Sequence, residues 1–175
     1  LKEIAEYSVS LLESKSPALN DLVGSLDYRD FGPIWKPEIN PNYLYLTNLI
    51  IDNAKNPETL NTTDPESGWT VLHTAALNNN LDVCTKIINK IKDKNPSNRS
   101  GATPLHFAVK FGNLPICELI VNNIEDLNPR INQGVFKGLT PLDWASLYPH
   151  KDVYKLIETA ISKQNENKSK RRRLQ

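Results

Sequence analysis

The 175-residue sequence predicts an all-α solenoid, in which short helix-turn-helix repeats stack side by side. Two observations predict this fold class. An octet of residues occurs three times, and an apolar stripe with helical spacing follows each copy at the same distance. A repeat period of about 20–50 residues is typical of small units that bury a continuous core only when they are stacked.

The octet begins at Gly68, Gly101 and Gly138, so the intervals between copies are 33 and 37 residues. Its versions read Gly-Trp-Thr-Val-Leu-His-Thr-Ala, Gly-Ala-Thr-Pro-Leu-His-Phe-Ala and Gly-Leu-Thr-Pro-Leu-Asp-Trp-Ala. The glycine suits a tight turn with positive φ. The threonine can cap a helix whose first position is Pro104 in the second copy and Pro141 in the third. We therefore expect a turn and a short first helix in each copy.

The third residue after each threonine is His73, His106 or Asp143. A side chain at this position can reach back to the cap, and Thr140 with Asp143 resembles a shortened capping box. Leucine and small residues fall on one face of each first helix, where they let neighbouring helices approach closely. These residues are Leu72, Ala75, Ala76, Leu105, Ala108, Leu142 and Ala145.

A second helix is expected in each repeat, because apolar residues four apart lie on one helix face. The stripes are Val83, Ile87 and Ile91, then Ile116, Ile120 and Ile124, then Val153, Ile157 and Ile161. The interval from Ile124 to Ile161 is again 37 residues, so the four extra residues of the third copy lie between Ile124 and Gly138. The insertion therefore lengthens a loop and leaves the helices unchanged.

These residues resemble the ankyrin-repeat family, whose signature is Gly-x-Thr-Pro-Leu-His-x-Ala-Ala. The resemblance covers roughly residues 61 to 161. It implies a solenoid of helix-turn-helix repeats joined by short β-hairpin loops. The sequence departs from the signature without removing a helix: Val71 replaces proline, Asp143 replaces histidine, Ser146 replaces alanine, and Asn79 and Pro149 stand where the family prefers glycine.

The residues before the first regular copy predict further helices. Residues 1 to 26 read as two helical pieces, and three prolines between Tyr28 and Asn42 forbid a continuous helix there. The apolar residues from Leu44 to Ile51 are typical of the second helix of a degenerate first repeat.

The predicted division has three parts. Residues 1–42 form an N-terminal helical cap and a Pro-rich connector, and residues 163–175 form a basic disordered tail. The repeat domain spans 43–162, with regular repeats starting near 67, 100 and 137. Lys151, Lys155 and Glu158 give the last second helix a polar outer face, so we expect the array to end near Ile161.

Composition and charge bound the class of protein. The chain contains no methionine and begins with Leu1, so we expect a fragment or a processed product. No apolar run approaches the about 20 residues that cross a bilayer, so we expect no membrane span in this chain. The net charge of +1 conceals a basic end, because residues 163–175 hold six Lys or Arg and one Glu.

Cys84 and Cys117 are the two cysteines and occupy the same place in consecutive second helices. Neighbouring helices pack about 8–10 Å apart, whereas a disulfide needs Cα atoms within about 7 Å. We therefore expect reduced thiols, which fit a cytoplasmic or nuclear location.

No constellation of residues predicts catalysis or a bound metal. The repeat phase accounts for both cysteines and for His73 and His106, and structural zinc needs four ligands with short local spacings. The chain lacks a phosphate-binding loop, a Gly-x-Ser-x-Gly elbow and a His-Glu-x-x-His motif. We expect no enzyme activity, no cofactor, no metal and no small-molecule substrate.

The basic end contains Lys170, Arg171, Arg172 and Arg173 after a polar linker. Such a run is typical of a nuclear-import signal, and it can also contact nucleic acid or an acidic membrane surface. The alternative is a solvated end without a role. Nucleic acid is an unlikely partner on this reading, because an isolated run of this length has little capacity to read bases.

The resemblance implies that a partner protein binds the concave groove, which is made of the hairpin fingers and the open faces of the first helices. Candidate positions follow the small pair of each first helix or lie on the fingers beside the turn glycines. They include Trp69, Leu77, Asn78, Arg99, Lys110, Phe111, Phe136, Lys137, Leu139, Leu147 and Tyr148. The alternative for Trp69 and Phe136 is packing across neighbouring fingers, and we expect Phe107 and Trp144 to be core or partly buried.

The predicted function is therefore protein binding to an unidentified partner protein, by a nuclear or cytoplasmic adaptor or inhibitor. The alternative is a targeting or substrate-recruiting ankyrin segment of a larger enzyme or channel.

Overall fold

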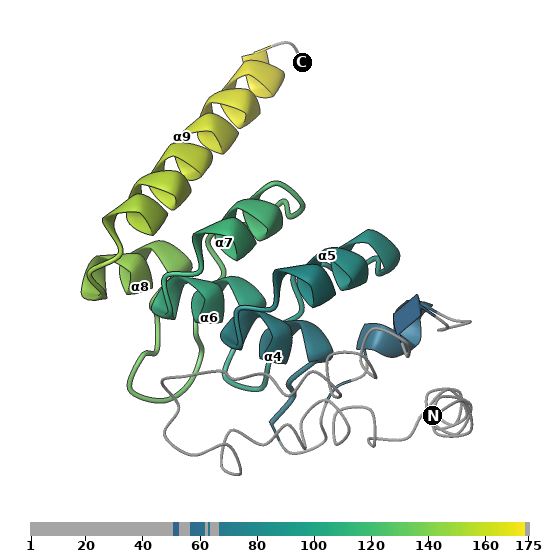
Figure 1. Cartoon of the computed structure of the whole chain (residues 1–175). Coiled ribbons are helices and arrows are strands. Elements are labelled where there is room, and N and C mark those ends of the chain that lie inside the picture. The colour runs from purple at the N-terminus through teal and green to yellow at the C-terminus, as the bar shows by residue number, and fades with distance from the viewer. Residues whose placement is uncertain (1–50, 53–56, 62, 64–66, 174–175) are drawn as a thin grey trace, which may run out of the picture.

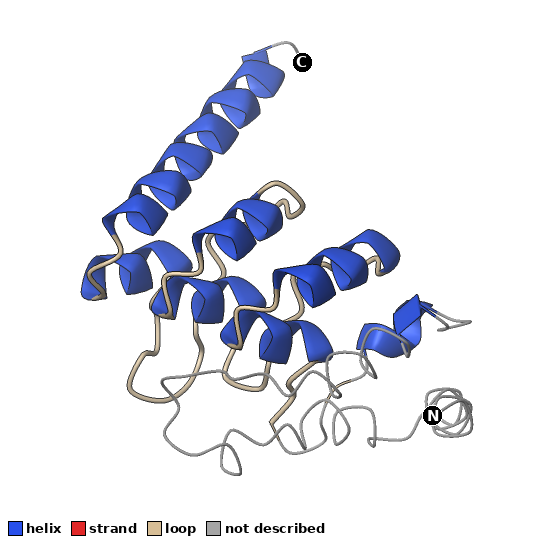
Figure 2. Cartoon of the chain, in the orientation of Figure 1, coloured by secondary structure: helices blue, strands red, loops and turns tan. Residues whose placement is uncertain are grey.

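The computed structural model describes residues 51–52, 57–61, 63 and 67–173. The predicted N-terminal cap and Pro-rich connector, and most of the predicted degenerate first repeat, lie outside these residues. The described part contains helices joined by loops and turns, with no β-strand assigned in it (Figure 2). The predicted all-α class is confirmed.

Helices form three pairs. The first helices are α4 (Val71–Leu77), α6 (Pro104–Lys110) and α8 (Pro141–Leu147). The second helices are α5 (Leu81–Lys90), α7 (Leu114–Val121) and α9 (Lys151–Arg173). Each first helix contacts its own second helix and the first helices beside it, and the second helices contact one another in the same order. The pairs therefore stack as two rows of helices (Figure 1).

Every first helix begins at the threonine that the sequence indicates. The backbone N–H of Thr70 donates to His73 Nδ1 at 3.1 Å, and Thr103 N–H donates to His106 Nδ1 at 3.1 Å. In the third repeat Thr140 N–H donates to an Asp143 carboxylate oxygen at 2.8 Å. Each contact satisfies a backbone donor at the helix start that would otherwise lack a partner. The predicted reach of the side chain back to the cap is therefore confirmed.

The core lies between the two rows of helices. Its largest buried members include Leu72 and Leu105 from the first helices and Ile87, Ile120 and Ile157 from the second helices. The predicted stripes extend slightly beyond regular helix, because Ile91 caps α5 and Ile124 follows the end of α7, yet both side chains are buried.

Turns closed by backbone hydrogen bonds join successive repeats. We call residues 96–102 the second finger and residues 129–139 the third finger. Asn98 N–H donates to the Ala102 carbonyl at 2.9 Å in the second finger, and Ile131 N–H donates to the Leu139 carbonyl at 3.0 Å in the third. These pairs give a hairpin course, although the paired stretches are too short to be assigned as strands. The four extra residues of the third copy fall in its longer finger.

Adjacent fingers are also linked to one another. Arg99 N–H donates to the Ser67 carbonyl at 3.1 Å, and Asn132 N–H donates to the Ser100 carbonyl at 2.7 Å. In both links the acceptor is the residue before the turn glycine. The same bond therefore joins each finger to the next one along the stack.

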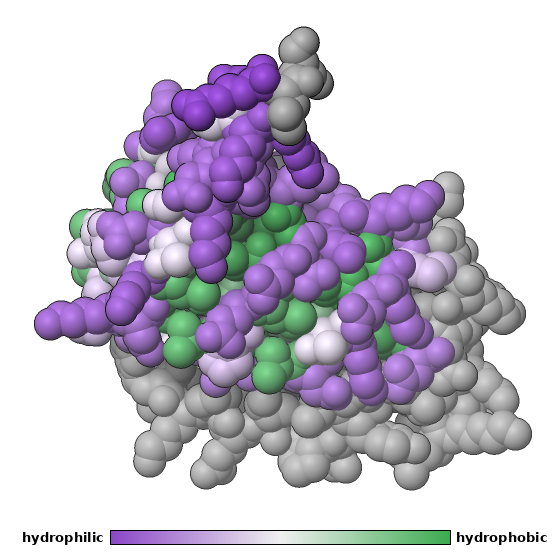
Figure 3. Space-filling view, turned by 90° about the horizontal axis from the view of Figure 1, so that it is seen from above, coloured by the Kyte–Doolittle hydropathy of each residue, from purple (hydrophilic) through white to green (hydrophobic). Residues whose placement is uncertain are grey.

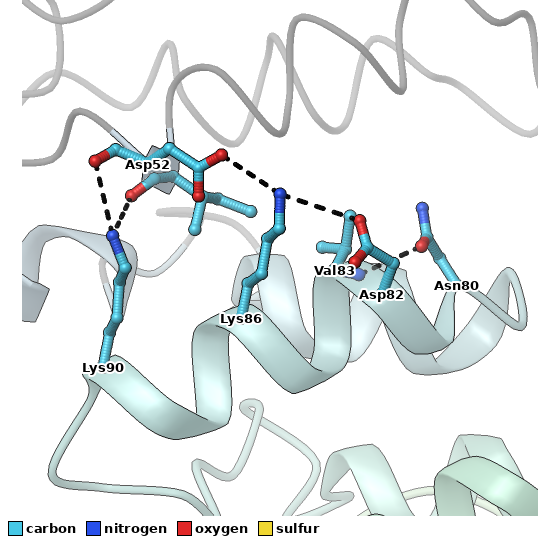
Figure 4. Close-up of polar contacts among 7 residues, drawn as sticks. Asp52, Asn80, Asp82, Val83, Lys86 and Lys90 are labelled. Atoms are coloured by element: carbon cyan, nitrogen blue, oxygen red, sulfur yellow. Dashed lines mark hydrogen bonds and ion pairs between the residues drawn. The ribbon is translucent and has the colours of Figure 1, made fainter.

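Polar contacts tie α5 to the chain that precedes the regular repeats (Figure 4). Lys90 Nζ donates to the Ile51 carbonyl at 2.7 Å, and Lys86 Nζ lies 3.1 Å from the Asp52 carboxylate. Ile51 is itself buried and helical, as expected for the apolar face predicted there. Exposed ion pairs contribute only about 0–1 kcal/mol, so apolar contacts of Ile51 and of Leu60 in the short 3-10 helix η1 (Pro57–Asn61) dominate this junction.

The outer face of the third repeat differs from its counterparts. Asp143 is only half-buried where His73 and His106 are fully buried, and Ser146 is exposed where Ala76 and Val109 are buried. No further described repeat covers these positions. A polar outer face is what a terminal repeat of a solenoid requires.

Helix α9 corrects the prediction of a disordered tail. It continues to Arg173, well beyond Ile161, as one helix that projects past the stack (Figure 1). Beyond Ile161 its residues are exposed, except for the half-buried Gln164. Lysine, arginine, glutamine and glutamate have high helix propensity, and the segment contains no glycine or proline to end the helix. An established helix therefore propagates into a sequence that lacks apolar residues.

Candidate functional site

A run of aromatic side chains crosses the repeats on the side of the first helices. The ring of Trp69 lies 4.5 Å from that of Phe107 in α6, and the ring of Phe107 lies 6.2 Å from that of Trp144 in α8. Trp144 in turn contacts Phe136 of the third finger at 5.1 Å and Tyr148 at 6.4 Å between ring centroids. We call these five residues the aromatic run.

Members of the aromatic run differ in exposure. Trp144 is 4% exposed, whereas Trp69, Phe107 and Tyr148 are half-buried and Phe136 is 39% exposed. The prediction that Phe107 and Trp144 are core or partly buried is confirmed. The alternative for Trp69 and Phe136 is packing across neighbouring fingers, whereas in the structure Trp69 packs on Phe107 of α6 and Phe136 on Trp144 of α8. This packing still leaves part of each ring except that of Trp144 at the surface.

The candidate residues that follow the small pairs lie at the C-terminal ends of the first helices. Asn78, Phe111 and Tyr148 are the C-caps of α4, α6 and α8, and Leu77, Lys110 and Leu147 precede them. Leu147 is 59% exposed, and the other five are half-buried. Lys110 Nζ lies 5.3 Å from the centroid of the Phe111 ring, a cation–π distance.

The remaining candidates lie on the fingers. Arg99 and Lys137 are exposed, and Leu139 is half-buried. The sequence indicates Arg130 only as the start of the long third finger, and its guanidinium donates to the Gly138 carbonyl at 2.6 Å and closes that finger. Val135, which is not one of the eleven candidates, lies at the exposed tip of that finger. None of the eleven candidate residues is buried.

The buried histidines of the first helices and the buried cysteines of the second helices are unsuited to acid–base or nucleophilic chemistry. Burial lowers the pKa of His73 and of His106 to about 4, so both imidazoles are neutral near pH 7. Burial raises the pKa of the free thiols Cys84 and Cys117 to about 12, which suppresses the reactive thiolate. In the described ranges, no three His, Cys, Asp or Glu side chains gather closely enough to hold a metal ion.

The residues predicted as an import signal, Lys170 to Arg173, form the last turn of α9. Their side chains are exposed, and this end of the helix is strongly hydrophilic when the molecule is seen from above (Figure 3). None of the described helices combines the length and apolar character of a membrane span. The basic turn therefore stands clear of the packed repeats.

Comparisons with known proteins support the repeat architecture. A family model described as ankyrin repeats (3 copies) matches residues 39–131. The matched range includes the helix pairs α4–α5 and α6–α7, and the third octet repeats the same pattern beyond it. A search of curated proteins gives no match to this chain. Since the family model covers more than half of the chain, the protein belongs to the ankyrin-repeat family.

Proposed function

We propose that this protein binds a partner protein through its finger–helix face, which we define as the second and third fingers together with α4, α6, α8 and Trp69. Ankyrin repeats generally mediate protein–protein interactions, and domains built from them are typically non-catalytic. The observation that carries the proposal is the aromatic run, which joins all three repeats on this face and stays partly exposed.

The energetic argument rests on rigid aromatic groups. Trp69, Phe107 and Tyr148 are held by their neighbours, so little side-chain freedom remains to be lost when a partner covers them. Large aromatic side chains of this kind dominate the energy of protein interfaces. Phe111 and Leu147 extend the apolar surface at the ends of α6 and α8.

Binding of this kind suits an adaptor or an inhibitor. Such a protein acts by occupying the surface of its partner and needs no reactive group of its own. The lowered pKa of the buried His73 imidazole and the raised pKa of the buried Cys84 thiol agree with a role that needs no reactive group.

The test compares alanine substitutions once a partner has been captured and identified. We expect Phe111→Ala and Tyr148→Ala each to weaken binding about tenfold or more, which corresponds to about 1.4 kcal/mol. Because Tyr148 also contacts Trp144, Leu147→Ala provides a third variant whose exposed side chain contributes little to folding. Binding is measured by calorimetry and folding by thermal melting.

Leu81→Ala is the matched control, because Leu81 is an exposed leucine at the start of the second helix α5. Its affinity should equal that of the parent. Parental affinity in all three test variants would contradict the proposal and place the interface elsewhere on the chain.

A further inference from the structure

Charge is sorted between the two sides of the second repeat, and the finger–helix face of the third repeat is also basic. The second finger and α6, residues 96–113, contain Arg99 and Lys110 and no acidic residue. The third finger and α8, within residues 129–150, contain Arg130 and Lys137 and one acidic residue, Asp143. Helix α7 and the loop after it, residues 114–128, contain three acidic residues and no Lys or Arg. Positive charge therefore lies on the finger–helix face and negative charge on the opposite side of the second repeat.

Two of these cations, Lys110 and Lys137, are available to a partner, whereas Arg130 donates to the Gly138 carbonyl of its own finger. Among the described residues, no carboxylate forms an ion pair with Lys110, Arg130 or Lys137. Lys110 Nζ lies over the Phe111 ring, which leaves its hydrogen-bond donors without a carboxylate. The nearby Asp143 carboxylate accepts hydrogen bonds from the Thr140 N–H and hydroxyl, each at 2.8 Å, which lower its pKa, and the charge of Arg130 lowers it further.

Cations and aromatic groups alternate along the same surface. Lys137 directly follows Phe136, whose ring contacts Trp144, and Lys110 directly precedes Phe111. An apolar side chain of a partner can therefore pack on one of these aromatic rings while a neighbouring carboxylate of the partner pairs with the adjacent lysine ammonium group. Carboxylates pair favourably with Lys and Arg, most of all where neighbouring apolar surface excludes water.

We propose that the partner presents an acidic peptide segment in which Asp or Glu residues flank large apolar side chains. This inference rests on the proposed function and specifies the chemistry of the partner at the same face. The acidic residues Glu118, Glu125 and Asp126 are exposed on the opposite side and repel such a segment. Within the second repeat, the charge distribution therefore favours the finger–helix face, and the aromatic groups distinguish this face from the basic last turn of α9.

A single-stranded nucleic acid fits this face less well. Bases bind by stacking on exposed aromatic faces. Here Trp144 is almost fully buried, and its ring meets those of Phe107 and Phe136 edge to face at 83° and 65°. The ring of Trp69 is partly covered by Phe107 at a centroid distance of 4.5 Å. The aromatic groups therefore offer edges and partial faces, which suit aliphatic and aromatic side chains of a peptide.

The test selects binders from a displayed library of random peptides against the full chain. We expect the recovered peptides to be enriched in Asp and Glu together with Leu, Phe or Trp, and their affinity to fall as salt is added. The double variant Lys110→Glu/Lys137→Glu should bind such a peptide at least about tenfold more weakly and should select peptides enriched in Lys or Arg. The control Lys151→Glu/Lys155→Glu reverses two exposed charges on α9 and should bind and select as the parent does.

The outcomes separate this inference from the proposed function. Peptides that lose affinity in Phe111→Ala but show no acidic enrichment would overturn the inference and leave the proposed function standing. Peptides unaffected by every substitution on the finger–helix face would overturn both. Recovery of no peptide at all, or displacement of the acidic peptides by single-stranded oligonucleotides at lower concentration, would also overturn the inference.

Discussion

His73 serves two roles at once. Its Nδ1 accepts from the Thr70 backbone N–H, so the neutral ring carries its proton on Nε2, which lies 3.1 Å from the Ala102 carbonyl of the next repeat. The ring therefore caps its own helix and donates to its neighbour. At His106 burial likewise lowers the pKa of the ring, and the Leu139 carbonyl, which is the corresponding group, offsets only part of this effect; no hydrogen bond of ordinary geometry forms at Nε2 among the described residues.

We predict that these two histidines make folding sensitive to mild acid. Their pKa is about 4 in the folded protein, because burial disfavours the charged ring, against 6.5 for an exposed imidazole. As pH falls below 6.5, the unfolded chain takes up protons first. The free energy of unfolding then decreases by about 1.4 kcal/mol per pH unit for each histidine until about pH 4, and above pH 6.5 their contribution is constant.

Urea denaturation over a pH series measures this effect. The double variant His73→Gln/His106→Gln lacks both titrating groups, so its stability should change less over the same range. Carboxylates titrate in both proteins, which makes the difference between the two curves the informative quantity. Parallel curves for the parent and the variant would show that the histidines are not responsible.

At the scale of elements, the fingers depend on their glycines in unequal ways. Gly101 has φ +81°, and a Cβ atom there would lie 2.9 Å from the Arg130 carbonyl oxygen of the third finger. Gly138 has φ +89°, but a Cβ atom there would meet no atom within 4 Å. The two glycines thus share a backbone conformation, but only Gly101 has a neighbouring finger packed against it.

This pair gives a matched prediction. Gly101→Ala and Gly138→Ala should both cost about 1–2 kcal/mol of stability for a side chain at positive φ. Gly101→Ala should cost about 1–3 kcal/mol more, because the added methyl group separates two fingers that are joined by a backbone hydrogen bond. Chemical denaturation of both variants measures the difference. Equal losses would mean that the fingers separate without cost.

The short helices were predictable and the extent of α9 was not. Each first helix begins with a local signal, a threonine followed three residues later by His73, His106 or Asp143, so the sequence alone defines where it starts. The apolar stripe that follows each octet indicates where the first helix must end and how far the second helix extends. After Ile161 no apolar stripe continues, and only helix propensity keeps the chain helical to Arg173.

We predict that the basic last turn of α9 promotes entry into the nucleus. Replacing Lys170 to Arg173 by alanine in a chain fused to a fluorescent reporter should lower the ratio of nuclear to cytoplasmic signal. Alanine is the best helix former, so circular dichroism should show an unchanged fold. Alanine at Lys151 and Lys155, two exposed cations of the same helix, should leave the distribution unchanged. An unaltered distribution in the first variant would argue against an import signal.

At the scale of the whole molecule, each repeat is stabilised only by its neighbours. Helix α6 contacts first helices on both sides, whereas among the described helices α8 has a first-helix neighbour on one side. We predict stronger protection from hydrogen exchange in α6 than in α8, and the weakest in α9 beyond Ile161, where the helix is exposed. Exchange followed by mass spectrometry tests this order. Equal protection of α6 and α8 would indicate that the stack opens as one unit.

The location of the candidate surface was predictable, but its chemistry was only partly so. Repeat register places Phe111 and Tyr148 at equivalent helix ends, and the sequence alone locates both. The contacts of Trp69 with Phe107 and of Phe136 with Trp144 join residues far apart in sequence or on different elements, and they depend on how neighbouring repeats approach. The segregation of charge likewise becomes a property of two faces only after α6 and α7 are seen on opposite rows.

The polar residues on the outer face of the third repeat also bear on self-association, because an exposed end of a solenoid can contact a second copy. Each repeat packs on the next one in the stack, so an apolar end of one copy could pack on the opposite end of another copy in the same way. Such head-to-tail contacts lead to open filaments unless the rotation between copies closes a ring. Asp143, Ser146 and Glu158 place a carboxylate, a hydroxyl and a second carboxylate where the earlier repeats carry groups that their neighbours cover. We therefore expect this polar face to disfavour head-to-tail association between copies.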